Sequence, residues 1–291
     1  MQIKDGAGAR AVTADLAHKG VIRSEWAFRR MLRRKGWDAK LKPGLYRIEK
    51  GSSSEVIGKK LAEHAAWRIK VTLPEGLTIQ QIAERIEKAG HEGDGQYLPT
   101  AAEVMRAATA AALRKSTGLK APAATAEGYL FPATYQFEAG ASADDIVSEL
   151  TGQFKKSFVS PNREEIIRSK LGLHELVTLA SIVEREAASD AERPKIAQVF
   201  LNRIAQGMRL QSCATVQYAL PKHKSRLLYE DLRIDSPYNT YMHKGLPPGP
   251  ICSPGKASLL AALRPEPTDA LYFVARGDGT HIFSKTYAEH Q

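Results

Sequence analysis

The chain has 291 residues, of which 43% are hydrophobic and 25% are charged, so it can bury a sizeable core and form two domains. Its 42 Lys and Arg outnumber its 32 Asp and Glu by ten, which favours an anionic partner such as nucleic acid, a lipid surface or an acidic polymer. Zinc-finger spacing, an RNA-binding aromatic motif and a basic zipper are all missing, so nucleic acid is the least favoured of these partners. A solvated basic face without a special partner would explain the charge as well.

Membrane and cofactor motifs are missing from the sequence too. No window approaches the roughly 20 apolar residues of a membrane span, and no signal-peptide pattern is present. The zinc-binding HExxH and CxxC spacings and a phosphate-binding loop are also lacking. We therefore expect no metal, nucleotide or other cofactor.

Three copies of one spacing occupy the first 90 residues. In each copy a short strand-like run leads to a glycine, and apolar residues follow six and ten positions later. The glycines are Gly6, Gly51 and Gly76, and the apolar pairs are Val12 and Leu16, Ile57 and Leu61, and Ile82 and Ile86. This spacing predicts a strand, a glycine turn and an amphipathic helix that packs one stripe on a small sheet. A further helix is predicted at 24–35, with Ser24 as its N-cap, and it carries the densest run of positive charge.

Later in the chain the pattern becomes mainly helical. Helices are expected at about 99–117, 142–158, 163–170, 174–188, 191–206, 214–220 and 256–263, and loops at 120–126 and across most of 207–254. An extended aromatic segment is expected at 127–137, and the runs 270–275 and 281–283 flank a glycine-rich turn typical of a β-hairpin. We predict an α+β fold, with small β/α units in residues 1–95 and a mainly helical domain in residues 96–291.

Two glutamates stand near the end of the predicted helix 174–188. Its apolar stripe consists of Leu176, Leu179, Ala180, Val183 and Ala187. At 100° per residue, Glu184 and Glu186 lie on opposite flanks of this stripe and about equally far from its centre, so periodicity does not choose between them. A carboxyl group beside an apolar wall has a raised pKa, as a general acid at neutral pH requires. Both glutamates could instead be boundary residues that pair with nearby arginines.

Polar residues that could line a sugar-binding groove come after this helix. They are Asn202 and Arg203 on the next helix, Gln211 and Thr215 beyond it, and Tyr238, Asn239, Thr240 and Tyr241 in a proline-rich loop at 236–254. Rings, hydroxyls and amides on a stiffened backbone suit the binding of a glycan. The alternative is a structural crossover packed on the core, with solvated polar side chains.

Glycoside hydrolysis normally uses two carboxyl groups across the scissile bond. Residues two apart on a helix point in different directions, so Glu184 and Glu186 cannot flank one bond. A mechanism with one carboxyl group fits better. The acid protonates the leaving oxygen, and the resulting base removes a proton from a substrate hydroxyl that attacks the anomeric carbon.

Ten segments of the chain resemble the YceG-like endolytic lytic murein transglycosylases. They are 42–46, 73–76, 127–132 (EGYLFP), 180–186 (ASIVERE), 199–203, 208–212, 238–241, 245–251 (GLPPGPI), 254–255 and 271–274. The resemblance implies cleavage of peptidoglycan between N-acetylmuramic acid and N-acetylglucosamine, with a 1,6-anhydro end as product. It also assigns the catalytic role to Glu186, the second glutamate of the Glu-x-Glu pair.

The same resemblance implies a domain layout and a location. Residues 1–95 are expected to be LysM-like, and residues 96–291 to form a lysozyme-like catalytic domain. The expected partners are peptidoglycan strands and the synthases that build the wall. Family members carry an N-terminal membrane anchor, which this sequence lacks, so an anchor is expected in a full-length protein. They act in the cell envelope, on the outer, periplasmic side of the inner membrane.

The sequence departs from the family pattern at two places. Cys213 and Ala214 replace an Asp-Pro pair, and Ala133 replaces an aspartate, so no role of these aspartates can be carried over. Cys213 and Cys252 lie in the two loops of the expected groove, and we hypothesise a disulfide between them, as an oxidising envelope would allow. It would stabilise the fold by about 3–4 kcal/mol in the entropic description. The alternative is two unpaired thiols.

Two other functions stay open at this point. The missing aspartates would suit a non-catalytic peptidoglycan-binding or scaffold protein with a degenerate site. A muramidase would use water in place of the substrate hydroxyl. The three possibilities differ in product. A lytic transglycosylase leaves anhydro ends, a scaffold protein forms no product, and a muramidase leaves reducing ends.

Overall fold

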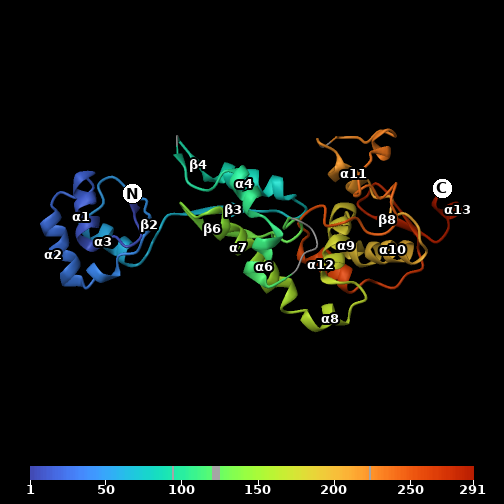
Figure 1. Cartoon of the computed structure of the whole chain (residues 1–291), viewed down its shortest axis with the longest axis horizontal. Helices are drawn as coiled ribbons and strands as arrows, with labels where there is room; N and C mark the ends of the chain where they lie inside the picture. The colour runs from blue at the N-terminus through green and yellow to red at the C-terminus, as the bar shows by residue number, and fades with distance from the viewer. Residues whose placement is uncertain (94, 120–124, 223) are drawn as a thin grey trace. The chain divides into compact units, whose positions relative to one another are not determined.

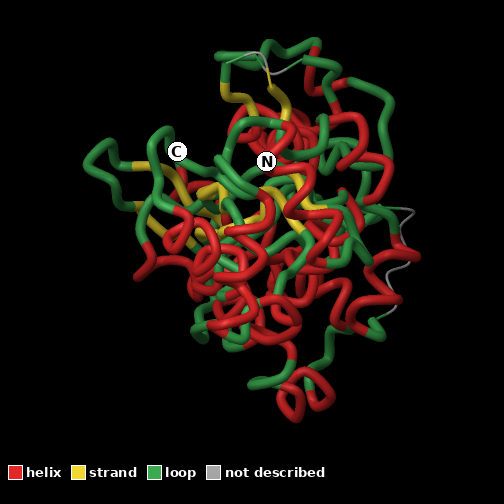
Figure 2. Tube along the Cα trace, turned by 90° about the vertical axis from the view of Figure 1, so that its left-hand side faces the viewer, coloured by secondary structure: helices red, strands yellow, loops and turns green. Residues whose placement is uncertain are grey.

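The computed structural model describes residues 1–93, 95–119, 125–222 and 224–291. The chain forms two compact units, and several segments of the sequence contribute to each. The first unit comprises Met1–Val71, Ile86–Pro99 and Tyr135–Ser142, and the second comprises Thr72–Arg85, Thr100–Thr134 and Ala143–Gln291. Helices with short, separate sheets make up both units (Figures 1 and 2), which confirms the predicted α+β class.

Three helices and a short antiparallel strand pair begin the first unit. They are β1 (Gln2–Ile3), α1 (Ala9–His18), α2 (Glu25–Lys35), β2 (Gly44–Leu45) and α3 (Ser54–Ala62). Their shared core contains Ile3, Val12, Leu16, Phe28, Leu32, Tyr46, Ile57 and Leu61. Four of these residues are apolar pairs of the first two repeats, so the stripe that the spacing predicted is the stripe that packs.

The glycine turns of the repeats are confirmed. Gly6, Gly51 and Gly76 all have φ between 72° and 88°, the left-handed region in which glycine carries no steric cost. Ser24 caps α2 as predicted, because its hydroxyl accepts a hydrogen bond from the backbone N–H of Ala27 at 3.3 Å.

The third repeat is formed by β3 (Arg68–Thr72) and α4 (Ile79–Gly90), followed by the β4–β5 pair (His91–Glu92 and Gly95–Gln96). β3 pairs with β6 (Thr134–Glu138), which lies more than 60 residues later. Of the extended segment predicted at 127–137, only its end is therefore a strand. A β-strand needs a neighbouring strand to hydrogen-bond with, and β3 pairs only with Thr134–Glu138.

Nine α-helices and one hairpin lie wholly within the described part of the second unit. They are α5 (Ala101–Ala107), α6 (Ala110–Thr117), α7 (Ala143–Phe154), α8 (Arg163–Arg168), α9 (Leu173–Glu186), α10 (Arg193–Ala205), α11 (Cys213–Ala219), α12 (Lys256–Leu263), the strands β7 (Tyr272–Ala275) and β8 (His281–Ser284), and the C-terminal turn of helix α13 (Tyr287–His290). The single helix predicted at 99–117 is two helices, because Thr109 caps a new one through the N–H of Ala112. None of the described helices combines the length and the apolar composition needed to cross a bilayer.

Helix α9 is the centre of the second unit. It packs on α12 and α10, and its residues from Leu176 to Val183 are all buried. The burial extends around the helix, beyond the predicted stripe, because Thr178 and Ser181 satisfy their hydroxyls on backbone carbonyls within the helix. The two candidate glutamates follow directly after this buried run.

Candidate active site

Glu186 is the last residue of α9, and its side chain is half-buried. The backbone leaves the helix at Ala187, whose ψ is 128°. The Ser212 hydroxyl donates a hydrogen bond of 2.5 Å to Glu186 Oε1. Among the described residues no other group hydrogen-bonds this carboxyl, so Oε2 is available to a substrate. Among the described residues, the Glu186 side chain is therefore neither fully exposed to solvent nor held in an ion pair.

Ser212 is a site residue that the sequence interpretation did not select. It occupies the N-cap position of α11, where a serine hydroxyl normally accepts a backbone N–H, yet here it caps nothing and turns to Glu186 instead. Its backbone is fixed on both sides: its N–H donates to Thr240 Oγ1 at 3.0 Å, and its carbonyl accepts from Thr215 Oγ1 at 2.8 Å. The sequence offered no signal for this contact, because an N-cap serine is expected to bond the backbone of its own helix.

Gln211 precedes Ser212 in a strained conformation. Its φ is 54°, which is uncommon for a residue other than glycine, and its N–H donates to the Thr240 carbonyl at 3.1 Å. Its side chain is exposed. The strained turn holds Ser212 toward Glu186 and leaves the Gln211 amide free to face a ligand.

Tyr241 and Arg203 complete the surroundings of Glu186. The Tyr241 hydroxyl lies 3.2 Å from Cys213 Sγ, and burial, followed by this contact, raises the pKa of Tyr241. Arg203 donates from Nε to the Leu271 carbonyl at 2.6 Å and from a terminal nitrogen to the Leu210 carbonyl at 2.7 Å, and it stacks on Tyr272. Burial lowers the pKa of Arg203 and the charge of Glu186 opposes that shift, which puts a fixed cation in the field of the carboxylate.

Four of the residues predicted to contact substrate belong instead to the scaffold. Asn239 is fully buried, and its amide donates to the carbonyls of Leu232 and Ile234. Asn202 donates to the carbonyls of Thr268 and Ala270. Thr215 and Thr240 are buried and hydrogen-bond each other at 2.8 Å. Their polar atoms are satisfied within the chain, so these residues build the wall of the site.

The proline-rich loop is anchored along α9. The Ile251 N–H donates to Ser181 Oγ at 3.0 Å, and the Pro248 carbonyl lies 2.9 Å from His174 Nε2. Tyr238, earlier in this loop, is half-buried and its ring lies 4.9 Å from that of Tyr218. The loop is thus a packed crossover that also carries ring faces toward the surface.

The predicted disulfide is wrong, because both cysteines are free. Cys213 is exposed and contacts the Tyr241 hydroxyl. Cys252 is buried, and its thiol donates to the Ser181 carbonyl at 3.3 Å. Burial raises the pKa of Cys252 well above its usual range, so it behaves as an inert, small core residue. The loops that carry Cys213 and Cys252 are held by hydrogen bonds of their own, and no disulfide joins them.

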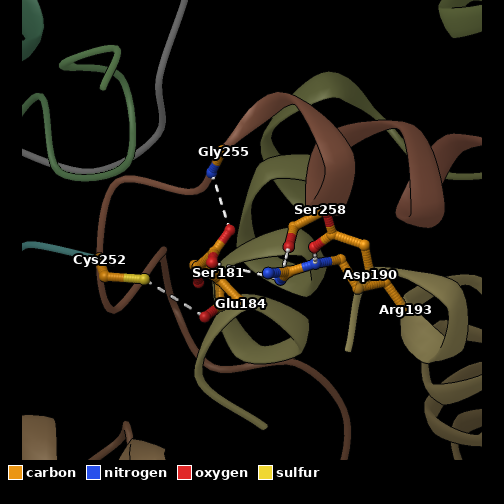
Figure 3. A network of polar contacts seen from close by, with 7 residues as sticks. All are labelled: Ser181, Glu184, Asp190, Arg193, Cys252, Gly255 and Ser258. Carbon is orange, nitrogen blue, oxygen red and sulfur yellow. Dashed lines mark hydrogen bonds and ion pairs between the residues drawn. The ribbon is translucent and has the colours of Figure 1, made fainter. Parts of the chain in front are cut away.

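Glu184 has a structural role that separates it from Glu186. Figure 3 shows its carboxylate at the centre of a polar network: Oε1 lies 3.2 Å from Arg193, and Oε2 accepts the Gly255 N–H at 2.9 Å. Arg193 also donates to Asp190 at 2.7 Å and to Ser258 at 2.6 Å. This network joins the end of α9 to the starts of α10 and α12.

A cleft of about 690 Å³ opens in the second unit. Its lining includes Thr78, Gln81, Glu127, Arg185, Gln217 and Tyr218. Arg185 adjoins Glu186 in the chain, but Glu186 and Ser212 themselves do not line this cleft. Its size is that of a ligand-binding site.

Glu127, in the wall of this cleft, is the most perturbed carboxyl group among the described residues. Both of its oxygens accept the Ile79 N–H at the start of α4, at 3.1 and 3.2 Å, and Tyr218 donates at 3.4 Å. Burial nevertheless raises its pKa to about 7, and these hydrogen bonds only partly oppose the shift. The sequence interpretation did not select Glu127, because its burial depends on residues almost 50 and 90 positions away.

Replacing Glu184 should destabilise the second unit. In Glu184→Gln the buried Arg193 loses its charged partner, and we expect a loss of about 3 kcal/mol in the free energy of unfolding. Chemical denaturation measures it. Glu164→Gln is the matched control, because it breaks an exposed pair with Arg168 that should contribute less than about 1 kcal/mol. Equal losses in the two variants would contradict the role of the network.

Glu127 should make stability depend on pH. Its pKa is raised from 4.5 to about 7 on folding, so between these values the folded chain holds a proton that the unfolded chain has lost. Stability should therefore fall as pH rises through this window, by about 3 kcal/mol. Glu127→Gln removes the titration and can still accept the Ile79 N–H. Denaturation near pH 5 and pH 8 should show a weaker pH dependence in the variant, and an unchanged dependence would refute the assignment.

Among the described residues no group of three or more His, Cys, Asp or Glu side chains could hold a metal ion. The candidate site consists of a carboxyl group, a serine hydroxyl, a tyrosine and a buried arginine. Such a set can transfer a proton to and from a bound substrate.

Comparison with known proteins places these residues in a family. The family model described as the YceG-like family matches residues 1–291. A protein of Bacillus subtilis (strain 168) named endolytic murein transglycosylase is 38% identical over 303 residues, which cover all of this chain and 82% of that protein. A protein of the same name from Streptococcus pneumoniae serotype 2 is 31% identical over 94% of this chain, which spans only 53% of it.

A solved structure gives the same answer. The crystal structure of a yceG-like protein from Listeria monocytogenes, at 2.6 Å resolution, is similar with a TM-score of 0.68 and 36% sequence identity. The similarity covers 99% of this chain and 96% of that one. The chain therefore belongs to the YceG-like family.

Proposed function

We propose that the chain is an endolytic murein transglycosylase that cleaves the β-1,4 bond between N-acetylmuramic acid and N-acetylglucosamine. The names of the relatives from Bacillus subtilis and Streptococcus pneumoniae support this activity. The single observation that carries the proposal is the half-buried Glu186 carboxyl, which Ser212 orients and whose second oxygen accepts no hydrogen bond from the described residues.

Glu186 acts first as an acid. Its proton passes to the glycosidic oxygen, and the bond from this oxygen to the anomeric carbon of N-acetylmuramic acid breaks. The Glu186 carboxylate then takes the proton of the 6-hydroxyl of the same sugar, whose oxygen bonds to the anomeric carbon. The products are a 1,6-anhydro end and a free 4-hydroxyl on N-acetylglucosamine, and no water is consumed.

One carboxyl group is enough for this sequence of steps, and the contacts support a one-carboxyl site. Glu184, the nearest carboxyl in sequence, is directed away into the Arg193 network. The intramolecular attack of a substrate hydroxyl replaces the second carboxylate that would otherwise activate water. Arg203 and Ser212 stabilise the carboxylate that exists between the two proton transfers.

Substrate contacts beyond Glu186 are assigned to residues whose polar groups face outward. Gln211 and Tyr241 lie next to the carboxyl group, and Tyr238 offers a ring face. Further sugars of the strand would extend along the cleft past Gln217 and Arg185.

The wider biology of the chain follows from the same proposal. Residues 1–95 would serve as a LysM-like region, and residues 96–291 as a lysozyme-like catalytic domain. The protein would work in the cell envelope, outside the inner membrane, in company with the synthases that supply new glycan. A membrane anchor would belong to the full-length protein.

Glu186→Gln should abolish cleavage. The amide cannot donate and then accept the proton, so we expect a loss of about a thousandfold or more with the fold intact. Purified peptidoglycan is incubated with the protein, and mass spectrometry identifies the products. Glu184→Gln, assayed at a temperature where it is folded, loosens the helix end but keeps the Glu186 acid, so it should lose far less activity than Glu186→Gln and serves as the control.

The products discriminate the alternatives. Anhydro ends support the proposal, whereas reducing ends would identify a muramidase. An absence of products from the wild-type chain would favour a non-catalytic scaffold, for which the replacement of the family's Asp-Pro pair by Cys213 and Ala214 is the specific sign. A similar loss in Glu184→Gln and Glu186→Gln would refute the assignment of the carboxyl group.

Ser212→Ala should lower kcat by about 10- to 100-fold and leave KM nearly unchanged, because the carboxyl group loses the donor that fixes its position. Steady-state kinetics on soluble glycan strands measure both constants. Ser212→Thr keeps a hydroxyl and should recover most of the rate. A change in KM alone would show that Ser212 only contacts substrate.

A further inference from the structure

The positive charge of the chain is concentrated in one region. Residues 1–71 contain 17 Lys and Arg and 7 Asp and Glu, a surplus of ten. The remaining 220 residues contain 25 of each sign and are neutral as a whole. The net charge of the protein therefore belongs to the part that holds α1, α2 and α3, and the proposed catalytic residues lie elsewhere.

One face of α2 concentrates this charge around an exposed indole. Trp26 is 68% exposed, an unusual value for the largest apolar side chain. At 100° per residue, Arg29 and Arg33 lie on one side of Trp26 and Arg30 and Arg34 on the other, all within about 80° of it. We call these five residues the α2 basic face. The buried Phe28 and Leu32 occupy the opposite side of the helix.

The charges of this face are largely unneutralised. Within the described residues, Arg30, Arg33 and Arg34 form no ion pair, and Arg29 makes only a loose one with Glu25 at 3.6 Å. Lys35, by contrast, pairs with Glu55 at 2.7 Å and is not part of the face. The four guanidinium groups of the α2 basic face are therefore available to a binding partner.

The surface around Trp26 is shaped for small anionic groups. Two hollows flank the indole. The four arginines line one of them together with Glu25, and Arg30, Arg34 and Lys35 line the other together with Met31. The Arg30 guanidinium lies 5.3 Å from the centre of the Trp26 ring. Guanidinium groups bind phosphates in a forked geometry, and an indole beside them can enter an apolar layer.

We propose that the α2 basic face binds the surface of a bilayer that contains anionic phospholipids. Trp26 enters the boundary between headgroups and acyl chains, and the four arginines bind the phosphates around it. A chain with an inactive catalytic site would bind in the same way.

Two other anionic partners fit this face less well. A glycan strand is recognised by amides and hydroxyls in a concave site, whereas the α2 basic face consists of guanidinium groups and one indole and has no amide or hydroxyl side chain. Single-stranded nucleic acid stacks successive bases on several aromatic rings, and here there is one ring. A planar array of phosphates above an apolar layer matches one central indole with charge on both sides.

Vesicle co-sedimentation of the full chain tests the proposal. We expect binding to vesicles of phosphatidylglycerol in phosphatidylcholine that weakens with added salt. The variant Arg29→Gln/Arg30→Gln/Arg33→Gln/Arg34→Gln should bind about a hundredfold more weakly, and Trp26→Ala about tenfold more weakly. Vesicles should shift the tryptophan fluorescence of the wild-type chain to the blue, and Trp26→Phe should abolish this shift.

A charge-matched variant is the control. Lys4→Gln/Arg10→Gln/Lys50→Gln/Lys59→Gln removes four exposed positive charges from the same 71 residues but outside α2, and should retain most of the binding. An equal loss in the two quadruple variants, equal binding to phosphatidylcholine alone, or an unchanged fluorescence shift in Trp26→Phe would overturn the proposal. If the α2 variants lose binding to purified peptidoglycan and keep binding to vesicles, the partner is the glycan and the proposal is wrong. Cleavage of soluble glycan strands should be unchanged in every variant.

Discussion

The buried ion pair between Glu184 and Arg193 is the constraint on which the site depends. It fixes the last turn of α9 against the first turns of α10 and α12, because Arg193 also bonds Ser258 and Glu184 also accepts the Gly255 N–H. A helix end normally frays, and a side chain on a fraying turn has no defined direction. The network removes this freedom two residues before Glu186, so the carboxyl group leaves the helix in a set direction.

A second network of hydrogen bonds, built around Ser212, contacts the Glu186 carboxyl group. Thr215 and Thr240 are buried, bond each other and hold the backbone of Ser212 at both its N–H and its carbonyl. Ser212 can then present its hydroxyl to Glu186, although its position would ordinarily make it a helix cap. The strained backbone of Gln211 is the local sign that tertiary contacts determine this turn. Rigid loops on a rigid helix place a reacting group more accurately than either could alone.

Three glutamates illustrate how environment divides roles among identical side chains. Glu184 is paired with Arg193 and structural. Glu127 is buried, caps α4 and has a pKa raised to about 7 by burial. Glu186 is half-buried with one free oxygen, and only this state suits a group that must give and take a proton. Charge is also distributed unevenly along the chain. The surplus of positive charge lies in residues 1–71, whereas Glu186 belongs to the remaining residues, which are neutral overall.

The sequence alone determined most of the helices, the C-terminal hairpin and the family. The glycine spacing predicted three strand–turn–helix copies, and the apolar residues of those copies are buried. The Ser24 cap and the hairpin could also be predicted, because helix caps, turns and amphipathic stripes depend on residues that are close together in the sequence. The resemblance pointed to Glu186 as the candidate acid. Only the tertiary structure showed that the polar groups of Asn202 and Asn239 are bonded within the chain, that Cys213 and Cys252 stay free, that Ser212 contacts Glu186 and that Glu127 is buried. These outcomes depend on hydrogen bonds and burial between residues up to 91 positions apart, and no local pattern carries that information.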